Sequence, residues 1–164
     1  MNMRIDHPRQ PGFVADYLLY LMAAASAAVS GEFHEQVRAR GIRVPEWRVL
    51  ACLADRDGQM VTQVAAIALL EQSRLTKTID QMAAKGLVRR RGDMKDRRRV
   101  RVFLTAAGRR IAGELVAAAR AHEAGILAQL APGEPEVLKA VLKRIHALHV
   151  GADAMENIRE EIAP

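Results

Sequence analysis

Eight arginine and lysine side chains fall within the short segment 89–101, and only two aspartates accompany them. The net charge of this segment, +6, equals the formal net charge of the whole 164-residue chain, so the rest of the chain is close to neutral. Cations at this density neutralise phosphates and attract polyanions or anionic surfaces. The segment therefore predicts an anionic partner.

A second polar group lies upstream of this segment, on a stretch with helical periodicity. It comprises Gln72, Ser73, Arg74, Thr76 and Lys77. Gln can pair with adenine and Arg with guanine, while Ser, Thr and Lys suit phosphates as well as bases. Taken alone, the group is also what an ordinary amphipathic helix with a solvated face would carry.

The elements that would position these groups follow from hydrophobic periodicity and from turn residues. Helices are expected at 12–40, 45–55, 63–69, 72–85, 106–130 and 134–162, and strands at 87–91 and 100–104. Pro45 is expected at the first position of its helix, with Thr62 and Thr105 as N-caps. The turn at 68–70 has no glycine, so we expect it to form without a left-handed residue.

The order of these elements is informative, because a charged hairpin directly follows the polar-faced helix 72–85. This arrangement is typical of a helix-turn-helix with a wing. The second helix of such a unit lies in the DNA major groove, and a basic wing tip suits the adjacent minor groove.

Five short motifs at these positions resemble the MarR family over residues 45–115. They are EWRVL at 46–50, QSRLTK at 72–77, KGLV at 85–88, GDMKDRRR at 92–99 and LTAAGR at 104–109. The resemblance implies a mainly α winged helix-turn-helix fold, with six helices, a short β-hairpin wing and terminal helices that form a dimerisation region. The DNA-contacting residues it implies in the wing are Arg89, Arg91, Lys95, Asp96, Arg97, Arg98 and Arg99.

Within this wing, Asp96 and Arg98 match the family's Asp-x-Arg pattern. The resemblance implies that Arg98 enters the minor groove and that Asp96 braces a wing arginine. The alternative for Asp96 is a plain turn residue.

The resemblance also implies a division of the chain. We expect a mobile arm at 1–11, a dimerisation helix at 12–44, a DNA-binding domain at 45–104 and dimerisation helices at 105–164. The apolar stripe on 134–162 needs a partner, which a homodimer would supply. The alternative is packing of 134–162 on 13–40 within a monomer.

Family members often bind small aromatic acids or phenolic compounds between the dimer helices and the DNA-binding head. The residues that would line such a site here are Tyr20, Phe33, His34, Trp47 and Arg48. Core packing for Phe33 and Trp47, and surface exposure for His34 and Arg48, are the alternatives.

No catalytic motif and no cofactor-binding motif is found, so the sequence does not predict an enzyme. His146 and His149 could form at most a weak metal site, and an interface or surface role is favoured. Cys52, the single cysteine, is interpreted as a buried structural thiol rather than a redox sensor. The polar start of the chain and the short apolar stretch 17–29 predict a cytoplasmic protein without a membrane partner.

Together these features predict a sequence-specific DNA-binding transcriptional regulator. We expect a ligand-responsive repressor that binds a palindromic operator as a homodimer. A winged-helix protein–protein module with its basic hairpin on an acidic partner is the alternative. A membrane-surface protein ranks last, because segment 89–101 is predicted to be a hairpin and not a basic amphipathic helix.

Overall fold

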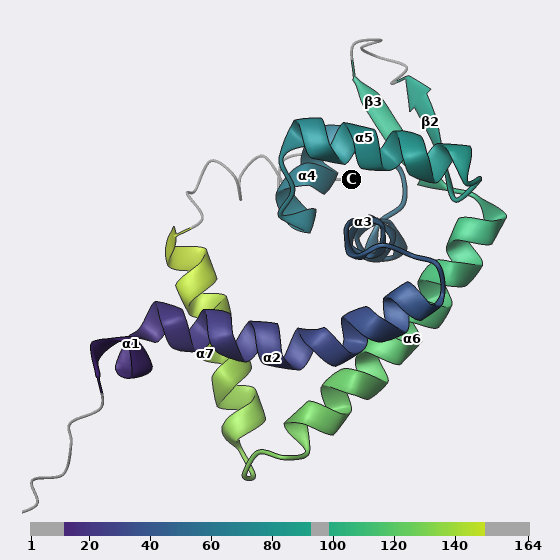
Figure 1. The fold of residues 1–164 in the computed structure, drawn as a ribbon. Coiled ribbons are helices and arrows are strands. Elements are labelled where there is room, and N and C mark those ends of the chain that lie inside the picture. Colours follow the sequence, from purple (N-terminus) through teal and green to yellow (C-terminus); the bar gives the residue numbers. More distant parts are fainter. Residues whose placement is uncertain (1–11, 93–98, 150–164) are drawn as a thin grey trace, which may run out of the picture.

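A computed structural model describes residues 12–92 and 99–149 (Figure 1). Its helices are α1 Phe13–Asp16, α2 Leu18–Ala39, α3 Val44–Asp55, α4 Val61–Ala68, α5 Gln72–Ala84, α6 Ala106–Leu127 and α7 Glu134–His149. Its strands are β1 Gln59–Met60, β2 Val88–Gly92 and β3 Val100–Leu104. The mainly α winged helix-turn-helix expected from the sequence is confirmed. The arm 1–11, the wing-tip positions 93–98 and the end of the last helix lie outside the described residues.

The wing strands belong to a three-stranded antiparallel sheet in the order β1-β3-β2. Strand β1 is too short to show periodicity, so the sequence predicted only the hairpin. Its Gln59 side chain is buried and donates to the carbonyl oxygens of Cys52, at 2.7 Å, and Arg56, at 2.9 Å. This side chain therefore ties the end of α3 to the sheet.

The core lies where α3, α5, α6 and the sheet meet. Its largest fully buried apolar side chains are Leu50, Leu53, Leu75, Ile79, Met82, Leu104 and Leu115. Leu75, Ile79 and Met82, which lie at i, i+4 and i+7, form the buried stripe of α5, so the opposite face of that helix is turned to solvent. Burial of each such side chain contributes about 1.5–3 kcal/mol.

Two predicted helix starts are wrong, and one predicted helix is interrupted. Helix α3 begins at Val44, so Pro45 is its second residue rather than its first. Helix α4 begins at Val61 with Met60 as its N-cap, so Thr62 lies inside the first turn. Gln63 accepts a hydrogen bond from the Met60 backbone N–H at 2.9 Å, which makes Met60 the boundary. The helix expected at 12–40 is interrupted at Tyr17, whose backbone is extended with ψ 119°.

The helix-turn-helix corner also differs from expectation, because it does contain a left-handed residue. Leu69 has φ 53° and ψ 48°, and its side chain is 77% exposed. A left-handed conformation costs an L-residue with a Cβ about 1–2 kcal/mol. Hydrogen bonds on either side keep Leu69 in this conformation: its N–H donates to Ala66 O, and the N–H of Leu70 donates to Ala65 O.

We predict that Leu69→Gly raises the free energy of unfolding by about 0.5–1 kcal/mol, because glycine adopts positive φ without the steric cost. The matched control is Ala66→Gly in the exposed part of α4, which should lower it by about 1 kcal/mol. Urea denaturation of both variants measures the two changes. If the Leu69→Gly protein is less stable than the parent, the left-handed conformation of Leu69 does not carry this steric cost.

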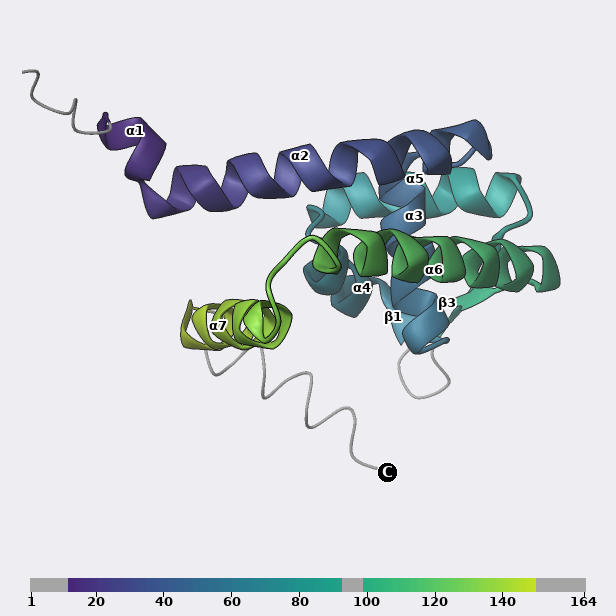
Figure 2. The ribbon, with the colours of Figure 1, turned by 90° about the horizontal axis from the view of Figure 1, so that it is seen from below.

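Helices α1, α7 and the first half of α2 project from the winged body (Figures 1 and 2). No residue of α7 is buried. Among the described residues, the exposed large apolar side chains all lie in the range 13–29 or on α7, apart from Ile67 and Leu69. None of the described helices has both the length and the apolar character needed to cross a membrane.

Candidate nucleic-acid interface

The predicted base-contacting group lies on the solvent-facing side of α5. Gln72, Ser73, Arg74 and Lys77 are exposed and Thr76 is half-buried. The Thr76 hydroxyl donates to the Gln72 carbonyl at 2.9 Å, whereas Leu75 and Ile79 on the other side are fully buried. Helix α5 therefore presents the first two turns of its polar face as a continuous surface.

The arginines of β2 alternate between the two faces of the sheet. The register pairs Arg90 with Val102, on the face that carries buried Val88 and Leu104 and packs against α5. Arg89 and Arg91 lie on the other face, where both guanidinium groups stack on the Phe103 ring at 5.9 and 5.6 Å from its centroid. Only Arg90 of these three is thus turned towards α5.

Arg90 is tied to α5 by an ion pair. Its Nη1 lies 2.5 Å from Oδ1 of Asp80, and both side chains are partly exposed. The pair joins the second half of α5 to the base of the wing. Exposed pairs contribute about 0–1 kcal/mol, so its main effect is on the direction of the Arg90 side chain.

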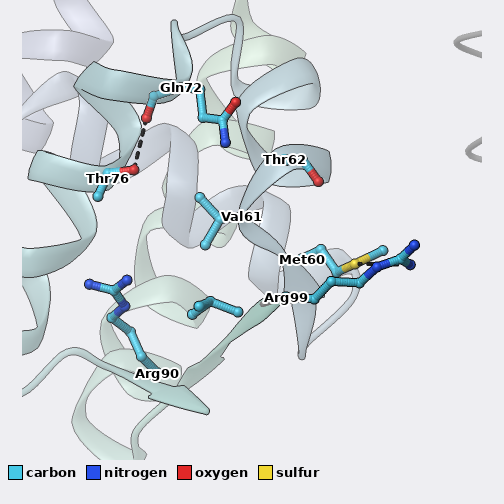
Figure 3. A pocket seen from close by; sticks show the side chains of 8 residues that line it. Met60, Val61, Thr62, Gln72, Thr76, Arg90 and Arg99 are labelled. Atoms are coloured by element: carbon cyan, nitrogen blue, oxygen red, sulfur yellow. Dashed lines mark hydrogen bonds between the residues drawn. The ribbon is translucent and has the colours of Figure 1, made fainter. Parts of the chain in front are cut away.

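A surface pocket lies between α4, α5 and the wing (Figure 3). It is lined by Met60, Val61, Thr62, Gln72, Thr76, Arg90, Arg99 and Val100. Figure 3 shows the Arg90 guanidinium extending towards Thr76. The pocket joins the polar face of α5 to the wing in one continuous surface.

Of the other predicted wing residues, Arg99 lies directly before β3, and its Nη1 contacts the Met60 sulfur at 4.0 Å. Lys95, Asp96, Arg97 and Arg98 lie outside the described residues. The bracing role of Asp96 and the groove contact of Arg98 therefore stay predictions.

A buried carboxylate lies behind α5, at the start of α3. Glu46 has no exposed side-chain surface and accepts from the Arg43 N–H at 2.8 Å, from Arg43 Nη2 at 2.8 Å and from Lys85 Nζ at 2.9 Å. Arg43 Nη2 also donates to Gln81 Oε1. Burial alone would raise the pKa of Glu46, but these hydrogen bonds and charges outweigh it and hold the pKa below the ordinary value.

Four of the five predicted effector residues lie together where α2 meets α3. The ring of Phe33 makes an edge contact with Trp47 at 5.3 Å between centroids. Burial and the charges of Arg38 and Arg48 lower the pKa of His34. Tyr20 is thirteen residues before Phe33 on the same helix, about 20 Å away along its axis.

Cys52 is buried in the core. Burial, followed by the nearby charge of Asp55, raises the pKa of its thiol to about 11. A redox sensor needs an exposed thiol with a lowered pKa. These properties fit the structural interpretation. Within the residues that the structure describes, no three His, Cys, Asp or Glu side chains are grouped as metal ligands.

Two residues near these sites were missed by the sequence analysis. Arg90 could have been found, since a two-residue period from Val88 places it on the α5 side of the sheet. His122 of α6, whose ring lies 5.7 Å from that of Phe33, gives no such signal, because nothing local relates it to α2.

Residues 42–100 match the MarR family model. The MarR family regulator SPO1453 of Silicibacter pomeroyi DSS-3 is 50% identical, with a TM-score of 0.77 over 84% of this chain and 98% of that one. The transcriptional regulator YkoM of Bacillus subtilis (strain 168) is 28% identical over 90% of this chain and 97% of its own. The regulator TtmR of Methylorubrum extorquens (strain PA1) is also 28% identical, over 64% of this chain and about half, 54%, of TtmR. The chain therefore belongs to the MarR family of DNA-binding transcriptional regulators.

Proposed function

We propose that the protein is a ligand-responsive repressor that binds a palindromic operator as a homodimer. The observation that carries this proposal is the continuous surface formed by the polar face of α5 and the basic wing. In our proposal Gln72, Ser73, Arg74, Thr76 and Lys77 contact base edges, and the wing residues 89–101 contact phosphates and the minor groove. As a transcription regulator, the protein is not an enzyme.

Selection of bound duplexes from a random DNA pool tests the operator directly. We expect a palindrome whose half-sites are centred about one helical turn, or a multiple of it, apart. Expression of a reporter placed behind this palindrome should fall when the protein is present. A selected site without twofold symmetry would contradict the proposal, and so would activation of the reporter.

We predict that Arg74→Ala relaxes base preference at one position of each half-site, with a loss of about 1–3 kcal/mol on the operator for a lost bidentate contact. Binding to a random duplex of the same length should change much less. Titration of both duplexes at one salt concentration measures the difference. Equal losses on the two duplexes would assign Arg74 to the phosphate backbone instead.

The proposed dimer would cover the apolar side chains of 13–29 and α7. Phe13 is 76% exposed and Leu148 is 72% exposed, and exposed apolar surface at this level marks an interaction site. We predict a sedimenting species of about twice the 18.1 kDa chain mass at micromolar concentration. Leu138→Glu together with Val141→Glu should shift it towards monomer. Parent protein that sediments only as a monomer would contradict the dimer.

The proposed effector site is the group formed by Phe33, His34, Trp47 and Arg48. NadR, which is 24% identical and shares the fold, has been crystallised in complex with 4-hydroxyphenylacetate. We propose that a small aromatic acid or phenolic compound binds here, with a carboxylate paired to the guanidinium of Arg48, whose Nη1 also donates to the Ala68 carbonyl oxygen at 3.4 Å. Quenching of the fluorescence of Trp47, the only tryptophan, during titration with such compounds tests this site.

A further inference from the structure

The pocket between α5 and the wing lies where one strand of a bound DNA duplex would cross the protein. Adjacent grooves of a duplex are separated by one sugar-phosphate strand. If α5 enters the major groove and the wing enters the neighbouring minor groove, that strand must cross the protein between them. The surface between them is the pocket lined by Gln72, Thr76 and Arg90 (Figure 3).

The lining of this pocket suits a phosphodiester. The Arg90 guanidinium has five N–H donors, and the contact with Asp80 engages Nη1, one of its two terminal nitrogens. The amide of Gln72 and the hydroxyl of Thr62 lie on other walls of the pocket. Met60, Val61 and Val100 contribute apolar surface to its lining, against which sugar carbons can pack.

We propose that this pocket binds the backbone phosphate that separates the two grooves, and that Arg90, oriented by Asp80, is its main ligand. This inference rests on the proposed function, because it requires α5 and the wing to enter adjacent grooves. It assigns different roles to neighbouring arginines: Arg90 contacts the strand between the grooves, whereas Arg89 and Arg91 lie on the far side of the wing.

The test uses the full chain and the duplex selected from the random pool. Neutral methylphosphonates replace the phosphates of this duplex one at a time. The parent protein should lose about tenfold in affinity at one phosphate per half-site, the loss expected for one charge-assisted contact. Arg90→Ala should bind the unmodified duplex about tenfold more weakly and show no further loss at that phosphate.

Arg89→Ala is the matched control, since it removes the same charge from the next position of the same strand. It should remain as sensitive to that methylphosphonate as the parent. Affinity decreases with salt, and the slope of log affinity against log salt should become less steep by about 0.9 for Arg90→Ala. Arg90→Lys keeps the charge, so its slope should equal that of the parent protein. Arg90→Ala removes only an exposed ion pair, so the variant is expected to fold.

The inference is overturned if Arg90→Ala loses as much affinity as the parent protein at every methylphosphonate. It is also overturned if Arg89→Ala becomes insensitive to the same methylphosphonate as Arg90→Ala. Failure of the proposed function looks different. In that case the parent protein selects no duplex, or its binding is indifferent to substitutions in both α5 and the wing.

Discussion

Gly108→Ala is expected to lower the free energy of unfolding by about 3 kcal/mol, the upper end for overpacking a well-packed site. A Cβ at this position would lie 1.9 Å from the carbonyl oxygen of Leu87 and 2.9 Å from its carbonyl carbon. Both atoms are backbone, so no side-chain rotation relieves the clash. The first turn of α6 must move away from the start of β2 instead.

The same movement would disturb the wing. The Leu87 carbonyl oxygen accepts from the Thr105 backbone N–H at 3.0 Å, and the Thr105 hydroxyl caps α6 by accepting from the Gly108 N–H at 3.0 Å. Gly108→Ala therefore strains the junction that holds the base of β2 against α6. We expect DNA affinity to fall together with stability.

Gly113→Ala is the matched control for this prediction. Gly113 lies on the same helix with nothing within 4 Å of its added Cβ, so alanine should stabilise the protein by about 0.5–1 kcal/mol. Urea denaturation of both variants measures the contrast. A Gly108→Ala protein as stable as the parent would show that α6 and β2 do not approach this closely.

Glu46→Gln is expected to lower the free energy of unfolding by about 2 kcal/mol at neutral pH. The substitution weakens the charge-assisted hydrogen bonds of a buried carboxylate, and the loss is moderate because Arg43 and Lys85 remain partly solvated. The amide keeps one acceptor oxygen but places a donor beside Arg43 and Lys85. These two residues lie at the start of α3 and just past the end of α5, so the substitution also loosens α5.

The effect of Glu46→Gln should depend on pH. The hydrogen bonds hold the pKa of Glu46 in the folded protein below its unfolded value, near 4.5. The carboxylate therefore contributes its full stabilisation above that value, and the contribution is lost as pH falls through the lower folded pKa. The stabilities of parent and variant should converge as the pH is lowered through this range.

Glu114→Gln is the control, because its carboxylate forms an exposed pair with Arg110 on α6 at 2.7 Å. Its loss should stay below about 0.5 kcal/mol and vary little with pH. Denaturation series at neutral and acidic pH give both comparisons. A Glu46→Gln deficit that is no larger than that of Glu114→Gln would refute the role of the buried carboxylate.

Local chemistry in the sequence predicted most of the architecture of this protein. The buried stripe of α5, the cap of α6 by Thr105 and the alternation in β3 all depend on neighbouring residues, so they are visible in the chain itself. The concentration of positive charge at 89–101 likewise needs no structure to be recognised. These features determined the winged helix-turn-helix and the polar surface of α5.

Contacts between distant positions decided the rest. Glu46 meets Lys85 across 39 positions, and no local pattern in 43–48 predicts a carboxylate without exposed surface. Leu69 is left-handed because packing of α4 against α5 determines the angle of their turn, and this outweighs the preference of leucine. The sequence showed that the wing is basic, and the two-residue period of a strand separates Arg90 from Arg89 and Arg91. Only the tertiary structure placed Asp80 beside Arg90, because strand register and helix packing determine which neighbours a side chain meets.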